Sequence, residues 1–599
     1  MRVLLNEILI PPSNLALIAI SPMNPKLIAI AVLPFLFAAC APQPVKEAQK
    51  PVAPKPAVKE AVKAEPKLPD IALSDDLLFE FLLAEIAGQR GNLGIATESY
   101  VDMAKKTHDP RIVKRALDVS LFSGNANDAL EMARLLAAID PASEKAKETL
   151  SALLAHSENL EEARPNIEKL LSRQSGENLA KSLMQLDGLF AKQPDRQAVL
   201  SAVQDLTKPY LDQPEAHYAI AIAAWRAAQY GLALSEADKA LSLHPGWEMA
   251  ALLKAQILEQ SDRKRVEPFL ADFINQYPES QEVRLAYAKF LVAEKKFEAA
   301  RKEFLELKKT FPQNRDVAFA VGLLSLQLGD LDAAIADLRD LLKLGYQSPD
   351  LVRYYIAQAF ELKKNPSEAM KWYEKVEKAP QYLPAQTRIA YLLMQQEGMG
   401  KARRYLHSIQ TSDPQQKMFL ILAEAQMLHD SKDYRGAYAV LEKGLETFPD
   451  SPDLLYDEAM AAEKIGKIRE AEASLKKLIK LQPDYAQAYN ALGYTLVEHT
   501  TRYKEALLLL KKALALSPED PFILDSMGWL QYKMGNMPSS IDYLKRAYKG
   551  RHDPEIAAHL VEVLWAQGRH EDAKDLLQSS LKEHPDNELL LKSKRKLAP

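Results

Sequence analysis

The chain has 599 residues, of which 47% are hydrophobic and 26% are charged. This ordinary globular composition excludes collagen-like chains, wholly disordered chains and membrane proteins with many spans. The 77 basic and 81 acidic residues give a net charge of -4. Because there is no basic surplus to neutralise phosphates, we expect no nucleic-acid partner.

The first 39 residues have the organisation of a secretory signal. Lys26 precedes an apolar run that begins at Leu27, and small residues lead to Cys40, the only cysteine. The run from Leu27 to Ala39 would form a helix of about 20 Å, which is too short for a hydrocarbon core of about 30 Å. We therefore predict that residues 1–39 are a signal segment that is removed. The signal is complete from Met23 onward, and our hypothesis is that translation starts there.

The sequence Phe37-Ala38-Ala39-Cys40 resembles a bacterial lipobox, in which the cysteine becomes the lipidated first residue of the mature protein. Ala41 follows, where enteric-type lipoproteins retained in the inner membrane usually have aspartate. The resemblance thus implies a durable lipid anchor in the outer membrane. The alternative is that Cys40 is a small buried cysteine.

A linker is predicted for residues 40–70, which follow the signal. Residues 41–70 contain seven prolines, six lysines and six alanines. Such a segment has too little apolar surface to offset the entropy lost on ordering, so we expect it to be disordered.

Eight prolines after the linker recur at nearly constant intervals. They are separated by 33, 34, 68, 34, 35, 34 and 35 residues, and 68 is twice 34; they are Pro245, Pro278, Pro312, Pro380, Pro414, Pro449, Pro483 and Pro518. A period of 34 residues is typical of the tetratricopeptide repeat. Small residues such as Gly528 and large ones such as Leu544 recur in the same phase. We predict an all-α fold, a right-handed α-solenoid of fourteen or fifteen tetratricopeptide helix pairs.

The repeat signal varies along the chain. It is weak over residues 71–240, where we predict degenerate helix pairs that begin near Asp75, and regular over residues 241–590, the predicted array. Terminal units of repeat proteins are often atypical. Residues 591–599 remain as a C-terminal tail.

No pattern in the sequence indicates catalysis. Gly-x-Ser-x-Gly, His-Glu-x-x-His and phosphate-binding glycine motifs are absent from the sequence. His552, His559 and His570 form the closest histidine group, but Pro554 interrupts it. We expect no catalytic residue, metal site or cofactor, and interpret adjacent acids such as Glu571 and Asp572 as a solvated helix face.

A protein-binding groove is predicted on the first helix of the last repeats. In tetratricopeptide repeats, positions 2, 5, 9, 12 and 13 of this helix face the concave side. The candidate groove residues are Asn490, Tyr494, Asp525, Trp529, Tyr532 and Trp565, with Glu498, Phe522, Lys533, Glu555 and Glu562 beside them. Aromatic rings with polar neighbours suit peptide binding. The alternative is that the aromatic residues pack between helices.

The lipobox, the linker and the array together resemble the large outer-membrane tetratricopeptide-repeat lipoproteins of Gram-negative bacteria. The resemblance is strongest to those that bind the periplasmic carboxyl-terminal processing protease. It is carried by residues 77–85, 492–496, 523–529 and 553–560. It implies a non-enzymatic adaptor on the periplasmic face of the outer membrane, which binds this serine protease and promotes degradation of cell-wall enzymes.

Two other functions remain open. One is an assembly or pilotin-like lipoprotein for β-barrel, pilus or exopolysaccharide export machinery, which would share the anchor and the fold. The other is an enzyme or sugar-binding protein that uses the groove.

Overall fold

A computed structural model describes residues 68–69, 71–141, 144–155, 160–190, 193–377 and 380–597. The predicted signal segment, the lipidation site Cys40 and most of the predicted linker lie outside these residues. The described residues form helices joined by short turns, and no β-strand occurs among them. The predicted all-α solenoid of tetratricopeptide helix pairs is confirmed.

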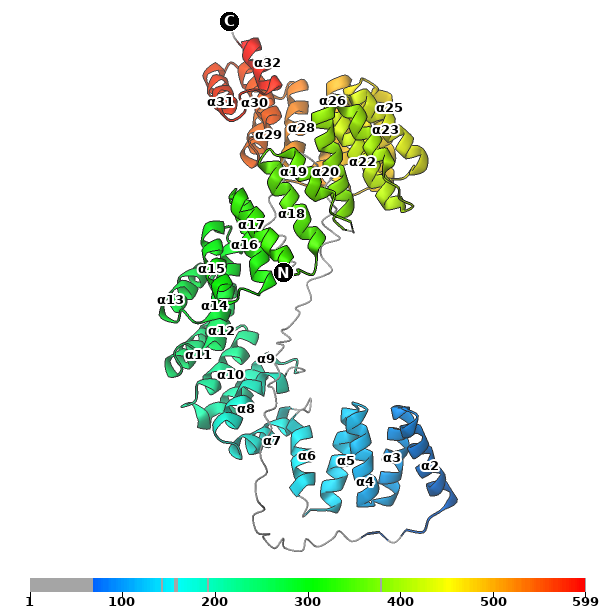
Figure 1. Cartoon of the computed structure of the whole chain (residues 1–599), viewed down its shortest axis with the longest axis vertical. Coiled ribbons are helices and arrows are strands. Elements are labelled where there is room, and N and C mark those ends of the chain that lie inside the picture. The colour runs from blue at the N-terminus through cyan, green and yellow to red at the C-terminus, as the bar shows by residue number, and fades with distance from the viewer. Residues whose placement is uncertain are drawn as a thin grey trace. The chain divides into compact units, whose positions relative to one another are not determined.

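The chain divides into two compact units, the first ending at Pro312 and the second beginning at Gln313. Figure 1 draws their helices, coloured by residue number. This division falls inside the predicted array 241–590. The helices of the first unit are α2 (Asp75–Gln89), α3 (Leu93–Thr107), α4 (Pro110–Phe122), α5 (Ala126–Ile139), α6 (Glu144–Ala155), α7 (Leu160–Ser172), α8 (Gly176–Leu189), α9 (Arg196–Thr207), α10 (Pro214–Arg226), α11 (Tyr230–Leu243), α12 (Glu248–Ser261), α13 (Val266–Gln276), α14 (Gln281–Ala293) and α15 (Phe297–Thr310). Two short 3₁₀ turns, Lys208–Tyr210 and Arg263–Arg265, accompany them.

The second unit contains the regular end of the array. Its helices are α16 (Arg315–Gln327), α17 (Leu331–Lys343), α18 (Pro349–Leu362), α19 (Pro366–Tyr373), α20 (Tyr382–Glu397), α21 (Met399–Ser408), α22 (Pro414–Asp430), α23 (Tyr434–Thr447), α24 (Pro452–Lys464), α25 (Ile468–Leu481), α26 (Ala486–His499), α27 (Tyr503–Leu516), α28 (Pro521–Lys533), α29 (Met537–Gly550), α30 (Pro554–Ala566), α31 (His570–Glu583) and α32 (Glu588–Leu597). The even-numbered helices are the first, or A, helices of the repeats, and the odd-numbered ones are the second, or B, helices.

The helix boundaries follow from capping residues and prolines. Ser74 accepts a hydrogen bond from the Leu77 amide, so α2 begins at Asp75, where the first helix pair was predicted. Asp520 accepts from two amides of α28, and Pro521 occupies the first helical position, where a missing amide costs nothing. The chain thus carries local signals for stopping one helix pair and starting the next.

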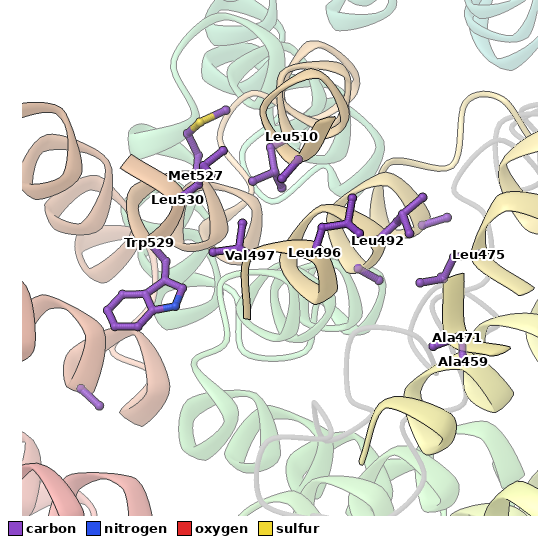
Figure 2. Close-up of a cluster of buried hydrophobic side chains, with 14 of the residues drawn as sticks. Ala459, Ala471, Leu475, Leu492, Leu496, Val497, Leu510, Met527, Trp529 and Leu530 are labelled. Carbon is purple, nitrogen blue, oxygen red and sulfur yellow. The ribbon is translucent and has the colours of Figure 1, made fainter. Parts of the chain in front are cut away.

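Close approach of the two helices of a pair depends on small residues. A Cβ atom on Gly493 of α26 would lie 2.8 Å from the Leu510 side chain of α27, which only a glycine avoids. The side chains of Ala459, Ala471, Leu475 and other residues form one buried cluster in the second unit, whose members lie between Ala425 and Leu590 (Figure 2). This cluster is the core on which the A helices are positioned.

The end of the chain is helical. Residues 591–597 of the predicted C-terminal tail belong to α32, whose start is capped by the Asn587 side chain at the Leu589 and Leu590 amides. Leu590 is completely buried. The helix therefore covers the last pair, α30 and α31, as both contact it.

A candidate protein-binding surface on the A helices

The A helices α24, α26, α28, α30 and α32 contact one another in series, each packing against the next A helix. They therefore form a continuous layer in the second unit. Four of the six predicted groove residues, Tyr494, Asp525, Trp529 and Tyr532, meet in this layer around His559 of α30. We call these five residues, with the acceptors Glu498 and Glu555, the A-helix cluster.

Trp529 lies at the centre of the A-helix cluster and joins three helices. Its ring stacks on His559 with centroids 4.2 Å apart, and its Nε1 donates a hydrogen bond to the Glu498 carboxylate of α26. The Lys533 ammonium lies 4.7 Å from the ring centroid. Only 5% of Trp529 is exposed, so this residue packs between helices, in agreement with the alternative interpretation of the aromatic residues.

Asp525 and His559, whose ring stacks on Trp529, form a largely buried polar pair. Both carboxylate oxygens of Asp525 lie 3.0 Å from His559 Nδ1. Burial of the imidazole acts to lower its pKa, but the carboxylate of Asp525, and then those of Glu555 and Glu498, outweigh burial and raise the pKa of His559 above its ordinary value. The three carboxylates therefore stabilise the protonated form of His559 relative to its neutral form.

Two tyrosines complete the aromatic part of the cluster: Tyr494 belongs to α26, and Tyr532 belongs to α28, as Trp529 does. The Tyr494 hydroxyl donates to Glu555 Oε1 over 3.1 Å, linking α26 to α30. Burial, followed by repulsion from Glu555, raises the pKa of Tyr494 well above its usual range. The Tyr532 ring lies 5.1 Å from Trp529, and burial raises its pKa as well. Both rings are partly exposed, so they can contact a bound segment.

The structure does not bring the other two predicted residues into ring or hydrogen-bond contact with this cluster. The Trp565 ring contacts His570 with centroids 4.2 Å apart. Asn490 Oδ1 is buried, and no described residue donates a hydrogen bond to it.

His559 is the residue that sequence reasoning missed, because it was considered only with His552 and His570. The structure gives each histidine a different neighbour: His552 stacks on Tyr548, His559 on Trp529, and His570 contacts Trp565. Asp525 and His559 are 34 residues apart, one repeat period, which was the available signal for their contact. No group of three or more potential metal ligands converges within the described residues.

A second surface lies on α2 at the start of the first unit. Its large apolar side chains are solvent-exposed, with Phe79 at 66% and Leu82 at 49%; Leu78, Phe81, Leu83 and Ile86 are exposed too. The helix contains Asp75, Asp76, Glu80 and Glu85 but no basic residue. Because α2 is apolar on nearly all sides, its sequence did not reveal which side packs and which faces solvent.

Comparisons with known proteins agree with this architecture. Tetratricopeptide repeat families match residues 319–384, 456–521 and 531–597. The TPR repeat-containing protein PA4667 of Pseudomonas aeruginosa is 32% identical over 498 residues, covering 82% of this chain and 83% of that protein. The chain belongs to the tetratricopeptide repeat family. This family consists of protein-interaction scaffolds, which are generally without catalytic activity.

Two further similarities each cover less than a third of the chain. Human tetratricopeptide repeat protein 7A is 30% identical over 184 residues, or 27% of this chain and 21% of that protein. The crystal structure of a thermophilic tetratricopeptide protein of Thermus thermophilus covers 30% of this chain and 97% of its own at 24% identity, with a TM-score of 0.28. Among the helices that the structure describes, none has the length and apolarity needed to cross a membrane.

Proposed function

We propose that this protein is an adaptor, anchored to the periplasmic face of the outer membrane by lipid on Cys40, that holds a carboxyl-terminal processing serine protease together with its substrates. The lipobox-like ending at Cys40, the proline- and lysine-rich linker and the repeat array support this proposal. Membership of the tetratricopeptide repeat family supports a role as a scaffold. A scaffold that binds both enzyme and substrate raises their effective concentration near one another.

The observation that carries the proposal is the exposed apolar side of α2. A soluble protein that leaves several large apolar side chains of one helix in water commonly has a partner for them. Phe79, Leu82 and Ile86 are spaced to lie along one side of the helix. A helix of this kind binds by laying its apolar side into a groove of a folded partner, and we assign it to the protease.

The A-helix cluster suits a different type of partner. Partly exposed tyrosines beside carboxylates can hold an extended segment, since the rings supply contact area and the acids orient cationic or amide groups. Tyr494 and Tyr532 are the partly exposed aromatic residues of the cluster, whereas Trp529 is buried and contacts the Tyr532 ring. We assign this surface to substrate.

Capture from bacterial envelopes tests the assignment of α2. The full-length protein, solubilised in detergent, is used to retain partners that mass spectrometry identifies. The double variant Phe79→Ser with Leu82→Ser should lose the processing protease, because the helix no longer offers an apolar surface. Leu508→Ser, on the exposed side of α27, is the matched control and should retain the protease.

The same experiment separates this function from the assembly alternative. Retention of barrel-assembly, pilus or polysaccharide-export components, with no protease, would contradict the adaptor function. A positive capture is followed by measuring cleavage of a cell-wall hydrolase by the purified protease, which the wild-type protein should accelerate and the α2 variant should not.

The anchor has its own test. Cys40→Ala should move the protein from the membrane fraction to the soluble fraction, while its helical circular-dichroism spectrum stays unchanged. Sedimentation of this variant with membranes after a salt wash would show that something other than lipid on Cys40 holds the protein there.

A further inference from the structure

A cavity of about 180 Å³ lies among α22, α23 and α24, on the N-terminal side of the A-helix cluster. Its walls include Gln426 and His429 of α22, Leu441 of α23, and Asp457 and Met460 of α24, with alanines between them. A buried water needs only about 10–15 Å³ of such space. The cavity is therefore large enough for a side chain of another molecule.

Asp457 is the one carboxylate in the wall of this cavity. No described residue forms an ion pair or hydrogen bond with it, and the same holds for Asp453, one helical turn earlier. Burial, followed by repulsion from Asp453, raises the pKa of Asp457 to about 6. A desolvated carboxylate without a partner is costly, and a cation placed beside it would remove that cost.

The other polar groups of the wall belong to α22 and have partners. Gln426 Nε2 donates to Asp430 Oδ1 over 2.8 Å, and His429 Nδ1 lies 3.9 Å from the same oxygen. The His429 ring also packs edge-on against Tyr434 with centroids 5.1 Å apart. The remaining wall is aliphatic or thioether, from Leu441, Met460 and the alanines. The cavity thus combines an apolar wall with a single unpaired negative charge.

This combination matches one class of side chain. Lysine and arginine have an apolar stem and a cationic head, so the stem packs on Leu441 and Met460 while the head reaches the carboxylate. An acidic side chain would be repelled by Asp457, and an apolar one would leave the carboxylate buried without a partner.

We propose that this cavity is a binding pocket for a lysine or arginine side chain of a bound protein segment, with the cationic head on the Asp457 carboxylate. The inference rests on the proposed function of the second unit as a surface for extended substrate segments. It specifies which segments bind: the segment carries a basic residue that enters the pocket beside α24, and another part of the segment contacts Tyr494 and Tyr532.

A labelled peptide pair tests the pocket directly. Binding of fluorescein-labelled tetra-arginine to the full-length protein in detergent is measured by fluorescence anisotropy at pH 7.5, beside tetra-citrulline, which keeps the shape and lacks the charge. The wild-type protein should bind the arginine peptide at least tenfold more tightly. Asp457→Asn should weaken arginine binding at least fivefold and leave citrulline binding unchanged.

Two further variants make the result specific. Glu446→Gln removes one negative charge from an exposed position of α23 and should bind tetra-arginine as the wild type does. Met460→Trp fills the cavity, keeps Asp457, and should weaken arginine binding as Asp457→Asn does. Equal affinity of wild type and Asp457→Asn for tetra-arginine would overturn the pocket.

The arginine-binding experiment and the protease-capture experiment can fail separately. If the protein captures the protease but Asp457→Asn binds arginine normally, the pocket is wrong and the adaptor function stands. If arginine binding depends on Asp457 but no protease is captured, the pocket stands and the adaptor function is wrong.

Discussion

The backbone of Gly528 in α28 lies directly against Leu544 of α29. A Cβ atom on Gly528 would be 2.7 Å from Leu544 Cγ and 3.2 Å from the Leu544 backbone nitrogen. Gly528→Ala should therefore force the two helices apart. The better helix propensity of alanine offsets part of the cost, so we expect a net loss of about 1–2 kcal/mol, seen as a lower midpoint of thermal unfolding.

Two variants test whether contact with Leu544 is the cause. Gly188→Ala in α8 meets no atom within 4 Å and should not lower the midpoint. Adding Leu544→Ala to Gly528→Ala should lower stability by less than the sum of the two single changes, because the larger residue at 528 occupies space that the leucine leaves. Simple additivity would show that the two positions do not interact.

Glu472 of α25 and Arg502, just before α27, connect two neighbouring B helices. Arg502 donates from Nη1 and Nη2 to the two carboxylate oxygens over 2.8 and 2.9 Å. This bidentate contact, together with Lys476 and against the effect of burial, lowers the pKa of Glu472 to about 2. Because the pKa is lowered on folding, the pair stabilises the protein above about pH 4.5, and that stability is lost as the pH falls toward 2.

Glu472→Gln should accordingly lower the free energy of unfolding at pH 7 by about 1 kcal/mol, since partial exposure of Arg502 weakens the pair. The difference from wild type should disappear near pH 2. Thermal unfolding at several pH values checks both statements. Glu571→Gln removes an acid from an exposed pair with Lys574 and should unfold as the wild type does; a constant deficit of Glu472→Gln at all pH values would exclude an ionic cause.

Asp525 should control the titration of His559. Because Asp525 and its neighbours raise the pKa of His559, the pair stabilises the folded protein below the ordinary histidine pKa of about 6.5, and this stabilisation is lost as the pH rises through the folded-state pKa. Asp525→Asn removes the nearest charge while burial remains. The pKa of His559 should therefore fall, which the ¹³Cε1 resonance of labelled histidine reports.

The matched control for this titration is Asp542→Asn, which removes an acid from the exposed side of α29. It should leave the His559 titration as in the wild type. An unchanged His559 pKa in Asp525→Asn would mean that Glu555 and Glu498 are sufficient to raise it without Asp525.

The sequence predicted the repeats well because their signals are local. Prolines at about 34-residue intervals, the glycine that faces Leu544 and the start of α2 at Asp75 each depend on residues of one helix pair. The exposure of Trp529 was not predictable in this way. It depends on His559 and Glu498, which belong to the next and the preceding A helix, so burial is decided by packing between repeats.

The same limit applies to the other surfaces. The residues of α2 are apolar on nearly all sides, and only packing against α3 determines that Phe79 faces solvent. Asp457 looks like any acid on a helix. That it lines a cavity and has no described partner follows from the spacing of α22, α23 and α24, which no motif encodes.

Asp457 should make the protein less stable as the pH rises from 4 to 7. Its pKa is raised to about 6, by burial first and by Asp453 second. The unfolded chain loses its proton near pH 3.9, so the folded state binds more protons between these values, and stability is lost as the pH rises through about 6. Besides Asp453, the polar groups around the cavity are Gln426 and His429 of α22.

Asp457→Asn should therefore be more stable than wild type by about 1–2 kcal/mol at pH 7 and equally stable near pH 4, as measured by thermal unfolding without any ligand. Asp453→Asn removes only the repulsion and should give a smaller gain. If Asp457→Asn were instead less stable at pH 7, the carboxylate would have a stabilising partner within the folded protein, and the pocket would not be free for a ligand. A gain in stability combined with a loss of arginine binding would identify Asp457 as a residue whose charge serves binding at the expense of folding.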